Sequence, residues 1–508
     1  MEAPLDRALV LVGFMGAGKS TGARTLAAEL GAAPLDTDLE LERRLGEPIE
    51  SFFDREGEQA FRAREEEVVL DLLERGGAPV IALGGGALQS ERVREALDGH
   101  TVVHLEVHPA DAWRRASGKG RPLARDPVRF EQLQRDRVPL YQSVADAVVP
   151  PADRDALRLA LPALLALSEA PGGTRLLWAP AASGDYPVFL GRGLIESRFF
   201  YPRAGRRFVV TDEHVARAQP FEGEERIVMA PGEERKNIHG AEFVLRALAR
   251  KGAGRGDLVV AVGGGVVGDV AGFCAAVYQR GLRHVQVPTT LVAQVDSAYG
   301  GKTGVDLPEG KNYVGAYHQP AAVLCDPAAL ETLPSVELAA GYVEVVKTAL
   351  IAGGPLWARV RQGGEVDVAT IMGCLHAKLA VVAADERDAG HRQVLNLGHT
   401  VGHAIEAATG YSRYRHGEAV GIGLLVALRL SERDALRREV AELLAARGLP
   451  LAFAGASVDD VLALITRDKK RAGGRVPFVL VEAPGEVTPG HQVHPARLRA
   501  AVDEVHAG

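Results

Sequence analysis

The chain contains few cysteines among its 508 residues, and none of them shows CxxC spacing. The three cysteines, Cys274, Cys325 and Cys374, lie far apart in the sequence. This pattern excludes a disulfide framework and a zinc site built from thiolates, and it suits the reducing cytoplasm.

Long apolar runs and blocks of basic residues are also missing. The apolar stretch 8–15 leads directly into a glycine-rich loop without a cleavage site, whereas 156–167 and 419–430 are short and contain arginine. Such stretches predict core or amphipathic helices rather than a signal peptide or membrane spans. The formal net charge of −7 argues against nucleic acid as the main partner. We therefore expect a cytoplasmic protein whose partners are small molecules.

The length predicts more than one domain, because 508 residues exceed what a single hydrophobic core supports. Strand-like and helical stretches alternate in the first third of the chain and again after a segment rich in small residues. This alternation is typical of parallel sheets covered by helices, so the predicted fold class is α/β. The predicted boundaries are 1–167 for a three-layer α/β/α domain, 168–183 for a linker, 184–334 for a Rossmann-like domain and 335–508 for a mostly helical domain.

The last domain shows long helical stretches and little sign of strands. One short strand is expected at Phe478–Val481. The predicted helices of this domain are 335–352, 370–385, 393–409, 417–432 and 434–447.

The strongest local motif is Gly13-Phe-Met-Gly-Ala-Gly-Lys19-Ser20, which fits GxxxxGK[ST] between a predicted strand and a predicted helix. Its glycines allow backbone N–H groups to converge on phosphate oxygens, Lys19 reaches the terminal phosphates, and Ser20 can bind Mg²⁺. The candidate ATP-binding residues of this loop are Gly16, Ala17, Gly18, Lys19, Ser20 and Thr21.

Three further features follow the loop. Asp36-Thr-Asp38 comes where a second strand should end, Arg62 follows an aromatic pair, and Gly84-Gly85-Gly86 ends another strand. Each alone is a weak signal, since an acidic pair is usually a solvated turn and a single arginine is usually a surface charge. In this order, however, they resemble shikimate kinase over residues 1–165.

The resemblance implies a P-loop fold of the nucleoside-monophosphate-kinase type and ATP-dependent phosphorylation of the 3-hydroxyl of shikimate. Asp38 would hold the substrate hydroxyls and act as, or assist, the base. Arg62 and Arg137 would bind the carboxylate, to which a planar guanidinium is suited. Gly84, Gly85 and Gly86 would contact the ring.

The same resemblance implies the nucleotide and metal contacts. Asp36 would support Mg²⁺ together with Ser20, Arg115 would stack on adenine, and Arg121 would stabilise the transferred phosphoryl group from a mobile lid. The sequence departs from the family here, because it has RPLA where RPLL is usual and the lid is a few residues shorter. We expect these changes to affect lid motion and nucleotide affinity.

The second half contains a different glycine-rich turn. Residues 257–269 read as a strand, the turn Gly-Gly-Gly-Val-Val-Gly-Asp269 and the start of a helix, which is typical of a dinucleotide phosphate site although it departs from GxGxxG. Glycines and cations are dense in 231–236, 288–302 and 310–312, and packing alone does not explain them.

The helical domain adds residues that bind metals. Glu344 lies one turn before Lys347, and His399 and His403 are spaced to share one face of a helix, with His416 at the start of the next. Two histidines and a glutamate suit a catalytic Zn²⁺ that keeps a position open for substrate. The alternative is a pair of hydrogen-bonded core histidines, which the surrounding polar residues disfavour.

These features resemble 3-dehydroquinate synthase over residues 184–508. The resemblance implies that Glu344, His399 and His416 bind Zn²⁺, or Co²⁺ in its place, and that His403 handles protons or phosphate. The NAD-binding residues would be Asp212, Glu233, Lys236, Gly264, Gly265, Val266, Val267, Gly268, Asp269, Thr289, Thr290, Lys302 and Lys311. The substrate-binding residues would be Arg280, Asp296, Lys302, Lys311, Asn312, Lys347, Lys378, Arg392, Asn396, His403 and Lys470, with Lys469 as an alternative to Lys470.

The implied reaction converts 3-deoxy-D-arabino-heptulosonate 7-phosphate into 3-dehydroquinate and phosphate, with NAD⁺ reduced and reoxidised in each turnover. Asp388 stands where the family usually has glutamate, and the shorter side chain could change the rate. The implied catalytic residues are Lys19, Asp38 and Arg121 in the kinase half and Lys302, Lys347, Asp388 and His403 in the synthase half. A second copy of the chain, bound through the synthase half, is an expected partner.

Other functions remain open at this point. The second half could be another sugar-phosphate cyclase or a polyol dehydrogenase, although a dehydrogenase would not need so many cations directed at phosphate. The first half could be another small-molecule P-loop kinase, such as a gluconate kinase. One half could also be an inactive binding module, but the motifs of both halves are intact.

Overall fold

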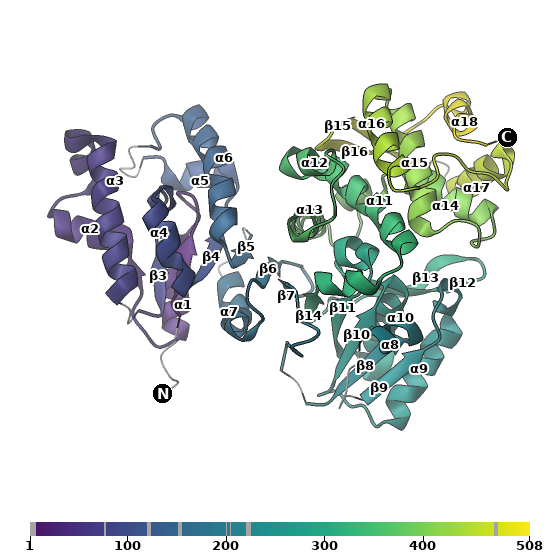
Figure 1. Cartoon of the computed structure of the whole chain (residues 1–508), viewed down its shortest axis with the longest axis horizontal. Coiled ribbons are helices and arrows are strands. Elements are labelled where there is room, and N and C mark those ends of the chain that lie inside the picture. The colour runs from purple at the N-terminus through teal and green to yellow at the C-terminus, as the bar shows by residue number, and fades with distance from the viewer. Residues whose placement is uncertain are drawn as a thin grey trace. The chain divides into compact units, whose positions relative to one another are not determined.

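The structure, a computed structural model, describes residues 7–75, 78–118, 123–150, 155–199, 201–203, 205–219, 225–471 and 476–507, without the side chains of 467–471. The chain divides into two compact units (Figure 1). Unit 1 comprises Met1–Pro180 and Gly184–Gly191, and unit 2 comprises Ala181–Ser183 and Arg192–Gly508.

Unit 1 is a parallel sheet covered by helices, as predicted. Its first five strands are parallel in the order β2-β3-β1-β4-β5, and β6 continues the sheet with antiparallel β7 beside it. The strands are β1 (Leu9–Val12), β2 (Leu35–Asp36), β3 (Val80–Ala82), β4 (Thr101–Leu105), β5 (Ala147–Val149), β6 (Arg175–Ala179) and β7 (Tyr186–Leu190). The helices are α1 (Lys19–Glu29), α2 (Thr37–Leu45), α3 (Ile49–Arg75), α4 (Glu91–Ala96), α5 (Pro109–Ala116), α6 (Pro127–Val144) and α7 (Ala156–Ala166).

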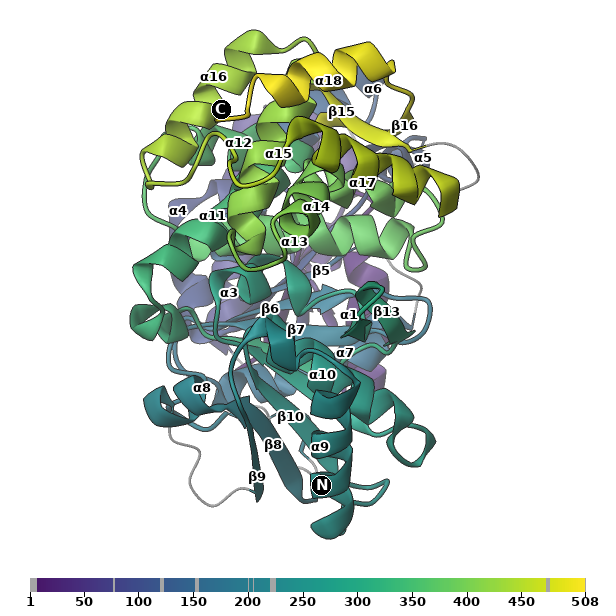
Figure 2. The ribbon, with the colours of Figure 1, turned by 90° about the vertical axis from the view of Figure 1, so that its right-hand side faces the viewer.

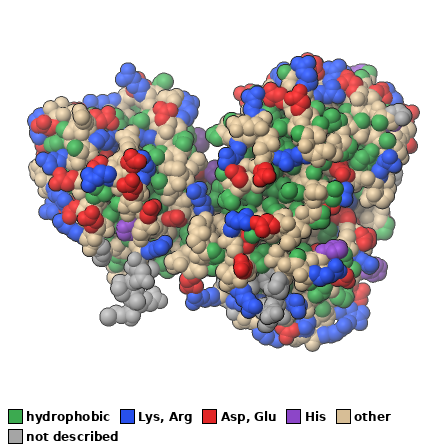
Figure 3. Space-filling model, in the orientation of Figure 1, with side chains coloured by type: hydrophobic (Ala, Val, Ile, Leu, Met, Phe, Trp, Pro, Cys, Tyr) green, Lys and Arg blue, Asp and Glu red, His purple; other side chains and the backbone are tan. Residues whose placement is uncertain are grey.

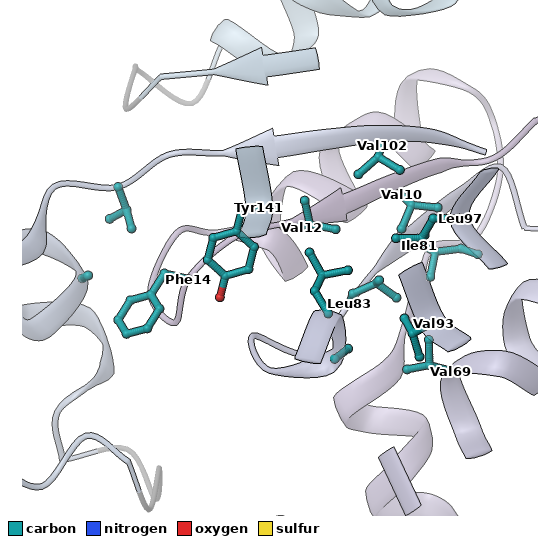
Figure 4. Close-up of a cluster of buried hydrophobic side chains, with 14 of the residues drawn as sticks. Val10, Val12, Phe14, Val69, Ile81, Leu83, Val93, Leu97, Val102 and Tyr141 are labelled. Carbon is teal, nitrogen blue, oxygen red and sulfur yellow. The ribbon is translucent and has the colours of Figure 1, made fainter. Parts of the chain in front are cut away.

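Apolar side chains from the central strands of unit 1 form one buried cluster (Figure 4). Val10 and Val12 of β1, Ile81 of β3 and Val102 of β4 are each at most 2% exposed. Burying one such side chain contributes on the order of 1.5–3 kcal/mol, so this cluster fixes the sheet whose carboxyl ends carry the site. Tyr141 of α6 reaches the same cluster.

In unit 2, parallel strands pair in the order β14-β11-β10-β8-β9. Helices α8, α9 and α10 lie beside these strands, whereas α11, α14 and α15 lie on the other side of the unit from β8, β9 and β10 (Figures 1 and 2). The strands are β8 (Arg207–Asp212), β9 (Glu225–Met229), β10 (Leu258–Gly263), β11 (Arg283–Pro288), β12 (Lys302–Leu307), β13 (Gly310–Tyr317), β14 (Ala322–Cys325), β15 (Phe478–Ala483) and β16 (Glu486–His491). The helices are α8 (Glu213–Ala218), α9 (Ile238–Arg250), α10 (Gly265–Val277), α11 (Ser335–Ala352), α12 (Gly354–Val360), α13 (Val368–Ala384), α14 (His399–Ala408), α15 (His416–Leu430), α16 (Asp434–Ala445), α17 (Val458–Arg471) and α18 (Pro495–Asp503).

Three sequence predictions differ from the structure. The last domain, in which only the strand Phe478–Val481 was expected, contains β15 paired with a second strand, β16. The segment 168–183, predicted as a linker, contains β6, which pairs with β5 and β7. The single helix predicted over 393–409 is divided into a 3₁₀ segment, His391–Asn396, and α14. The break falls at Gly398, whose φ of 79° suits glycine and where a Cβ atom would lie 2.9 Å from the backbone nitrogen of Leu424. Close packing of α14 on α15 therefore ends one helical segment and makes His399 the first residue of the next.

Surface and helix properties agree with the composition. On the face drawn in Figure 3, lysine and arginine side chains are interspersed with aspartate and glutamate rather than gathered by sign. Among the described residues, no helix combines the length and the apolar character needed to cross a membrane.

Candidate active sites

The first glycine-rich loop joins β1 to α1 and has the backbone shape of a phosphate cradle. Gly13 and Gly16 have φ values of 144° and 82°, and Cβ atoms there would lie 2.4 Å from the Leu105 oxygen and 2.7 Å from the Ala112 oxygen. Only glycine fits both the angles and the space. The ammonium group of Lys19 donates to the carbonyl oxygen of Gly13 at 2.8 Å, so its charge lies across the loop.

The predicted nucleotide and magnesium residues lie around this loop. Arg115 of α5 donates to the carbonyl oxygen of Gly16 at 3.2 Å. Ser20 and Asp36 line the same cavity of about 280 Å³. The Asp36 carboxylate also caps α2 by accepting from the backbone N–H of Asp38 at 3.1 Å. Arg121 lies outside the described residues.

The acceptor side of the kinase site places charged side chains against the second glycine run. A Cβ atom on Gly84 would lie 2.5 Å from Glu65 Oε1 and 2.7 Å from Asp38 Oδ1, and one on Gly86 would lie 2.1 Å from Arg62 Nη1. The glycines therefore make room for carboxylates and a guanidinium. Arg62 Nη1 lies 2.5 Å from Glu65 Oε2, and Glu65 is buried. Burial raises the pKa of Glu65, although Arg62 opposes that rise.

Two side chains of α6 donate hydrogen bonds to the middle glycine of this run, Gly85. The carbonyl oxygen of Gly85 accepts from Arg137 Nη1 at 3.0 Å and from the Tyr141 hydroxyl at 2.6 Å. Both side chains are buried, and burial raises the pKa of Tyr141 to about 12. The structure thus brings Asp38, Arg62 and Arg137 together around Gly84–Gly86. Sequence reasoning missed Glu65 and Tyr141, although each lies one helical turn after a predicted arginine.

The synthase half contains a cavity of about 1710 Å³. Its lining extends from the glycine turn after β10 to the start of α15, so it contains candidate residues for both nucleotide and metal binding. The predicted residues that line it are Asp212, Glu233, Lys236, Gly264, Gly265, Val266, Val267, Asp269, Thr289, Thr290, Asp296, Lys311, Asn312, His403 and His416. Those that do not line it are Gly268, Arg280, Lys302, Glu344, Lys347, Lys378, Asp388, Arg392, Asn396 and His399.

The glycine turn has the close packing that a dinucleotide site requires. A Cβ atom on Gly264 would lie 2.8 Å from Thr290 Cγ2, and α10 begins at the next residue. Lys236, which is buried, forms an ion pair with Asp269. Gly268 does not line the cavity, and its carbonyl oxygen accepts from Gln286 at 3.1 Å, which joins α10 to β11.

Glu344 is the centre of the candidate metal site. Its side chain is 0% exposed, and its Oε1 lies 3.7 Å from His399 Nε2 and 3.8 Å from His416 Nε2. That oxygen has no hydrogen-bond partner among the described residues, while Oε2 lies 2.5 Å from Lys347 Nζ. A buried carboxylate oxygen facing two imidazole nitrogens is costly unless a cation joins them. The donor set therefore fits a divalent metal such as Zn²⁺.

The histidines are close enough to one another to support this fit. Nitrogen atoms of His399, His403 and His416 all lie within 4.8 Å of one another. Burial lowers the pKa of His399 well below its usual value, which favours the neutral imidazole that metal binding requires. His403 and His416 line the cavity, whereas His399 does not.

The predicted substrate cations are held in a network of charges. Asp296 forms an ion pair with Lys378 and lies 3.8 Å from Lys347. Burial alone would raise the pKa of Asp296, but Lys347 and Lys378 hold it well below its usual range. Lys302 forms an ion pair with Asp388 on the loop that follows α13.

Several of the other predicted substrate residues do not line the cavity. Arg392 is buried and donates to the carbonyl oxygens of Glu386 at 2.6 Å and Gly300 at 3.1 Å. Arg280 and Asn396 are exposed and do not line the cavity, whereas Asn312 is exposed and does line it. The side chains of Lys469 and Lys470 lie outside the described part of the chain.

Sequence reasoning also missed two acidic residues of this half. The first is Glu406 of α14, which contacts both His416 and Lys311. The second is Glu386, whose carboxylate accepts from Gln319 Nε2 at 3.0 Å, from the Ser183 N–H at 3.0 Å and from the Ser183 hydroxyl. Glu406 lies one helical turn after His403, and this spacing could have indicated it. Nothing local in the sequence indicates Glu386.

Comparison with known proteins adds family matches to this geometry. Residues 15–165 match the shikimate kinase family, residues 226–340 match the N-terminal part of 3-dehydroquinate synthase, and residues 341–471 match its C-terminal part.

Individual relatives agree with these matches. The 3-dehydroquinate synthase of Nitrobacter hamburgensis is 42% identical over 356 residues, covering 63% of this chain and 93% of that protein. The enzyme of Caulobacter vibrioides is 40% identical, covering 64% and 98%. Among solved structures, a 2-deoxy-scyllo-inosose synthase complexed with carbaglucose-6-phosphate, NAD⁺ and Co²⁺ has a TM-score of 0.58 and 25% identity, covering 65% of this chain and 99% of that one.

Fold and sites together define a P-loop phosphotransferase joined to an enzyme of the sugar-phosphate cyclase type. The chain belongs to the 3-dehydroquinate synthase family, and it carries a shikimate kinase domain in front of the synthase. The prediction of a bifunctional shikimate-pathway enzyme is confirmed, and the matches favour it over fusion to a different cyclase.

Proposed function

We propose that the first half transfers the γ-phosphoryl group of ATP to the 3-hydroxyl of shikimate, and that the second half converts 3-deoxy-D-arabino-heptulosonate 7-phosphate into 3-dehydroquinate and phosphate. The cofactors are Mg²⁺ with ATP, and NAD⁺ with Zn²⁺ or Co²⁺. The observation that carries the proposal is the unpaired, fully buried Oε1 of Glu344, which faces two histidine nitrogens beside a cavity that also contains a glycine turn.

In the kinase half, the residues position charge rather than form covalent bonds, as phosphoryl transfer requires. Lys19 neutralises the transferred phosphoryl group, and Ser20 with Asp36 holds Mg²⁺. Arg62 and Arg137 bind the shikimate carboxylate. Asp38 accepts hydrogen bonds from the substrate hydroxyls, and its place against Gly84 supports this role.

In the synthase half, Glu344, His399 and His416 hold the metal, and the turn at Gly264–Gly265 receives the dinucleotide phosphates. When bound, the metal supplies Lewis-acid polarisation and NAD⁺ supplies a reversible hydride acceptor, which together acidify the C–H bond next to the oxidised carbon.

The protein groups orient the substrate around these cofactors. Asp296, held ionised by Lys347 and Lys378, accepts hydrogen bonds from the ring hydroxyls. His403, on the cavity wall, exchanges protons with the substrate. Lys302 is paired with Asp388. When the substrate binds, its phosphate would replace the Asp388 carboxylate as the partner of the Lys302 ammonium group.

We further propose a domain boundary near Pro334, where sheet gives way to helices, a homodimer formed through the synthase half and a cytoplasmic location. The first rests on the order of elements, since the strands of the parallel sheet end at β14 and helices α11–α16 follow. The homodimer rests on the family resemblance. The cytoplasmic location rests on that resemblance and on the three free, buried cysteines.

The synthase proposal is tested with the purified full chain, NAD⁺, Zn²⁺ and the heptulosonate phosphate. We expect phosphate and 3-dehydroquinate, identified by NMR, in equal amounts and without net NADH. Glucose 6-phosphate serves as the alternative sugar phosphate and should give no phosphate release. Turnover of glucose 6-phosphate in place of the heptulosonate would contradict the proposed substrate.

The kinase proposal is tested with ATP, Mg²⁺ and shikimate, with the product identified by ³¹P NMR. We expect shikimate 3-phosphate, and gluconate should not replace shikimate because its carboxylate lies on an open chain rather than a ring. Phosphorylation of gluconate alone would move the first half to another kinase class.

A further inference from the structure

Glu406 is a buried carboxylate between the candidate metal site and the candidate dinucleotide site. It lies on α14 and is 2% exposed. Its Oε2 lies 3.3 Å from His416 Nδ1, and its Oε1 lies 3.1 Å from Lys311 Nζ. Each oxygen therefore contacts a different cationic or donor group, and the two groups come from different elements, α15 and β13.

The contacts continue beyond Lys311. Its ammonium group also lies 3.2 Å from Glu233 Oε1, at the start of the short segment that precedes α9. His416, Glu406, Lys311 and Glu233 all line the cavity of about 1710 Å³. A continuous series of three polar contacts thus joins a candidate metal ligand to the loop proposed to receive the dinucleotide.

The contact with His416 fixes how that imidazole can act. With Nδ1 directed at Glu406, the ring presents Nε2 to Glu344, 3.8 Å from its Oε1. A carboxylate on the second nitrogen of a ligating histidine fixes the tautomer and the ring orientation, and removing such a partner commonly costs about 10–100-fold in metal affinity.

We propose that Glu406 is a positioning residue for both cofactors: one oxygen orients His416 toward the metal, and the other holds Lys311 against Glu233 at the dinucleotide loop. The inference rests on the proposed function, because the metal and NAD⁺ are the groups whose binding it affects. It assigns Glu406 no contact with substrate. Its consequence is that one substitution, at a residue that binds neither cofactor, weakens both.

The test measures cofactor affinity in the full chain rather than turnover. Metal affinity for Zn²⁺ is measured by competition with a chromophoric chelator, and NAD⁺ affinity is measured by calorimetry on the metal-loaded protein. For Glu406→Gln, which keeps the shape and removes the charge, we expect the Zn²⁺ dissociation constant to rise about 10–100-fold. The NAD⁺ dissociation constant should rise about 2–10-fold, which is the range for losing one hydrogen-bonded contact.

Two controls separate this role from a general loss of structure. Glu337→Gln makes the same change on the same cavity wall and breaks an ion pair with Arg415 at 2.7 Å, but it should leave Zn²⁺ affinity unchanged. The thermal unfolding curve, compared with that of the wild-type chain, reports whether Glu406→Gln is folded, and the kinase activity of the same preparation reports how much intact chain is present. Glu406→Asp keeps the charge and should recover part of the lost metal affinity.

The outcomes are distinguishable from failure of the proposed function. If the wild-type chain binds neither Zn²⁺ nor NAD⁺, the proposed function fails and this inference fails with it. If the wild-type chain binds both and folded Glu406→Gln binds them equally well, only the inference is overturned. A loss of Zn²⁺ affinity as large in Glu337→Gln as in Glu406→Gln would also overturn it, because the effect would then follow from any lost charge on the cavity wall.

Discussion

The two sites of this chain manage charge by different physical means. In the kinase half, glycines shape the backbone around a few charged side chains, so that Gly13 and Gly16 form the cradle and Gly84 makes room for Asp38. In the synthase half, opposite charges are buried against each other, as in Glu344 with Lys347. Backbone shape is fixed by the fold alone, whereas a buried ion pair is stable only while both partners are present. We therefore expect the loss of a single charge to lower the stability of the synthase site more than that of the kinase site.

The largest expected effect concerns the kinase half alone. Lys19→Ala removes the ammonium group that lies across the cradle, so kinase kcat should fall by about 10³-fold or more, while synthase turnover stays within experimental error. Steady-state assays of both activities on one preparation measure this. A parallel loss of synthase turnover would break the distinction between the two sites.

Glu344→Gln tests the buried ion pair. It removes a proposed metal ligand and leaves Lys347 buried without its nearest carboxylate. Synthase turnover should therefore fall by roughly 10²-fold or more, and the metal-free unit 2 should lose about 3 kcal/mol of stability. Chemical denaturation in the presence of a chelator measures the stability change. Unchanged stability would show that the charge balance at Glu344 contributes little.

The kinase site should respond mildly to loss of a neutral contact. Tyr141→Phe removes the hydroxyl that donates to the carbonyl oxygen of Gly85. Because one such hydrogen bond contributes about 1 kcal/mol, the KM for shikimate should rise about 5-fold, while the KM for ATP is unchanged. Because the pKa of Tyr141 is about 12, its hydroxyl is protonated at pH 6 and at pH 9 alike, so the effect should be equal at both.

A matched variant in the other unit serves as control for Tyr141→Phe. Tyr278→Phe removes a comparable hydroxyl bond, 3.1 Å long, to the Ala253 carbonyl oxygen, and it should leave the kinase parameters unchanged. A change in the KM for ATP as large as that for shikimate would contradict a specific effect on the glycine run.

The sequence predicts local motifs better than it predicts contacts between distant segments. Motifs that are contiguous in sequence, such as the Lys19 loop and the turn at Gly264, were found because their shape is local. The contacts of Glu406 and the Ser183–Glu386 pair depend on which distant segments the fold brings together. The helix break at Gly398 was missed for the same reason, since the packing of α14 on α15 causes it.

The smallest expected effect concerns the segment that was predicted as a linker. Ser183→Ala removes one of the hydroxyl and amide bonds to Glu386, whose carbonyl oxygen holds Arg392, so the synthase KM for the heptulosonate phosphate should rise about 2–5-fold. Kinase parameters should not change. An effect on the kinase alone would show that this segment belongs functionally to unit 1.

The most direct test of the difference between the two sites is metal replacement in the wild-type chain. The protein is treated with a strong chelator, dialysed, and supplied with Mg²⁺ alone or with Mg²⁺ and Zn²⁺, and both activities are measured on each sample. We predict full kinase activity with Mg²⁺ alone and recovery of 3-dehydroquinate formation only when Zn²⁺ is added. Full synthase activity in the Mg²⁺ sample, with Zn²⁺ shown to be absent, would contradict a metal site built on Glu344 and the two histidines.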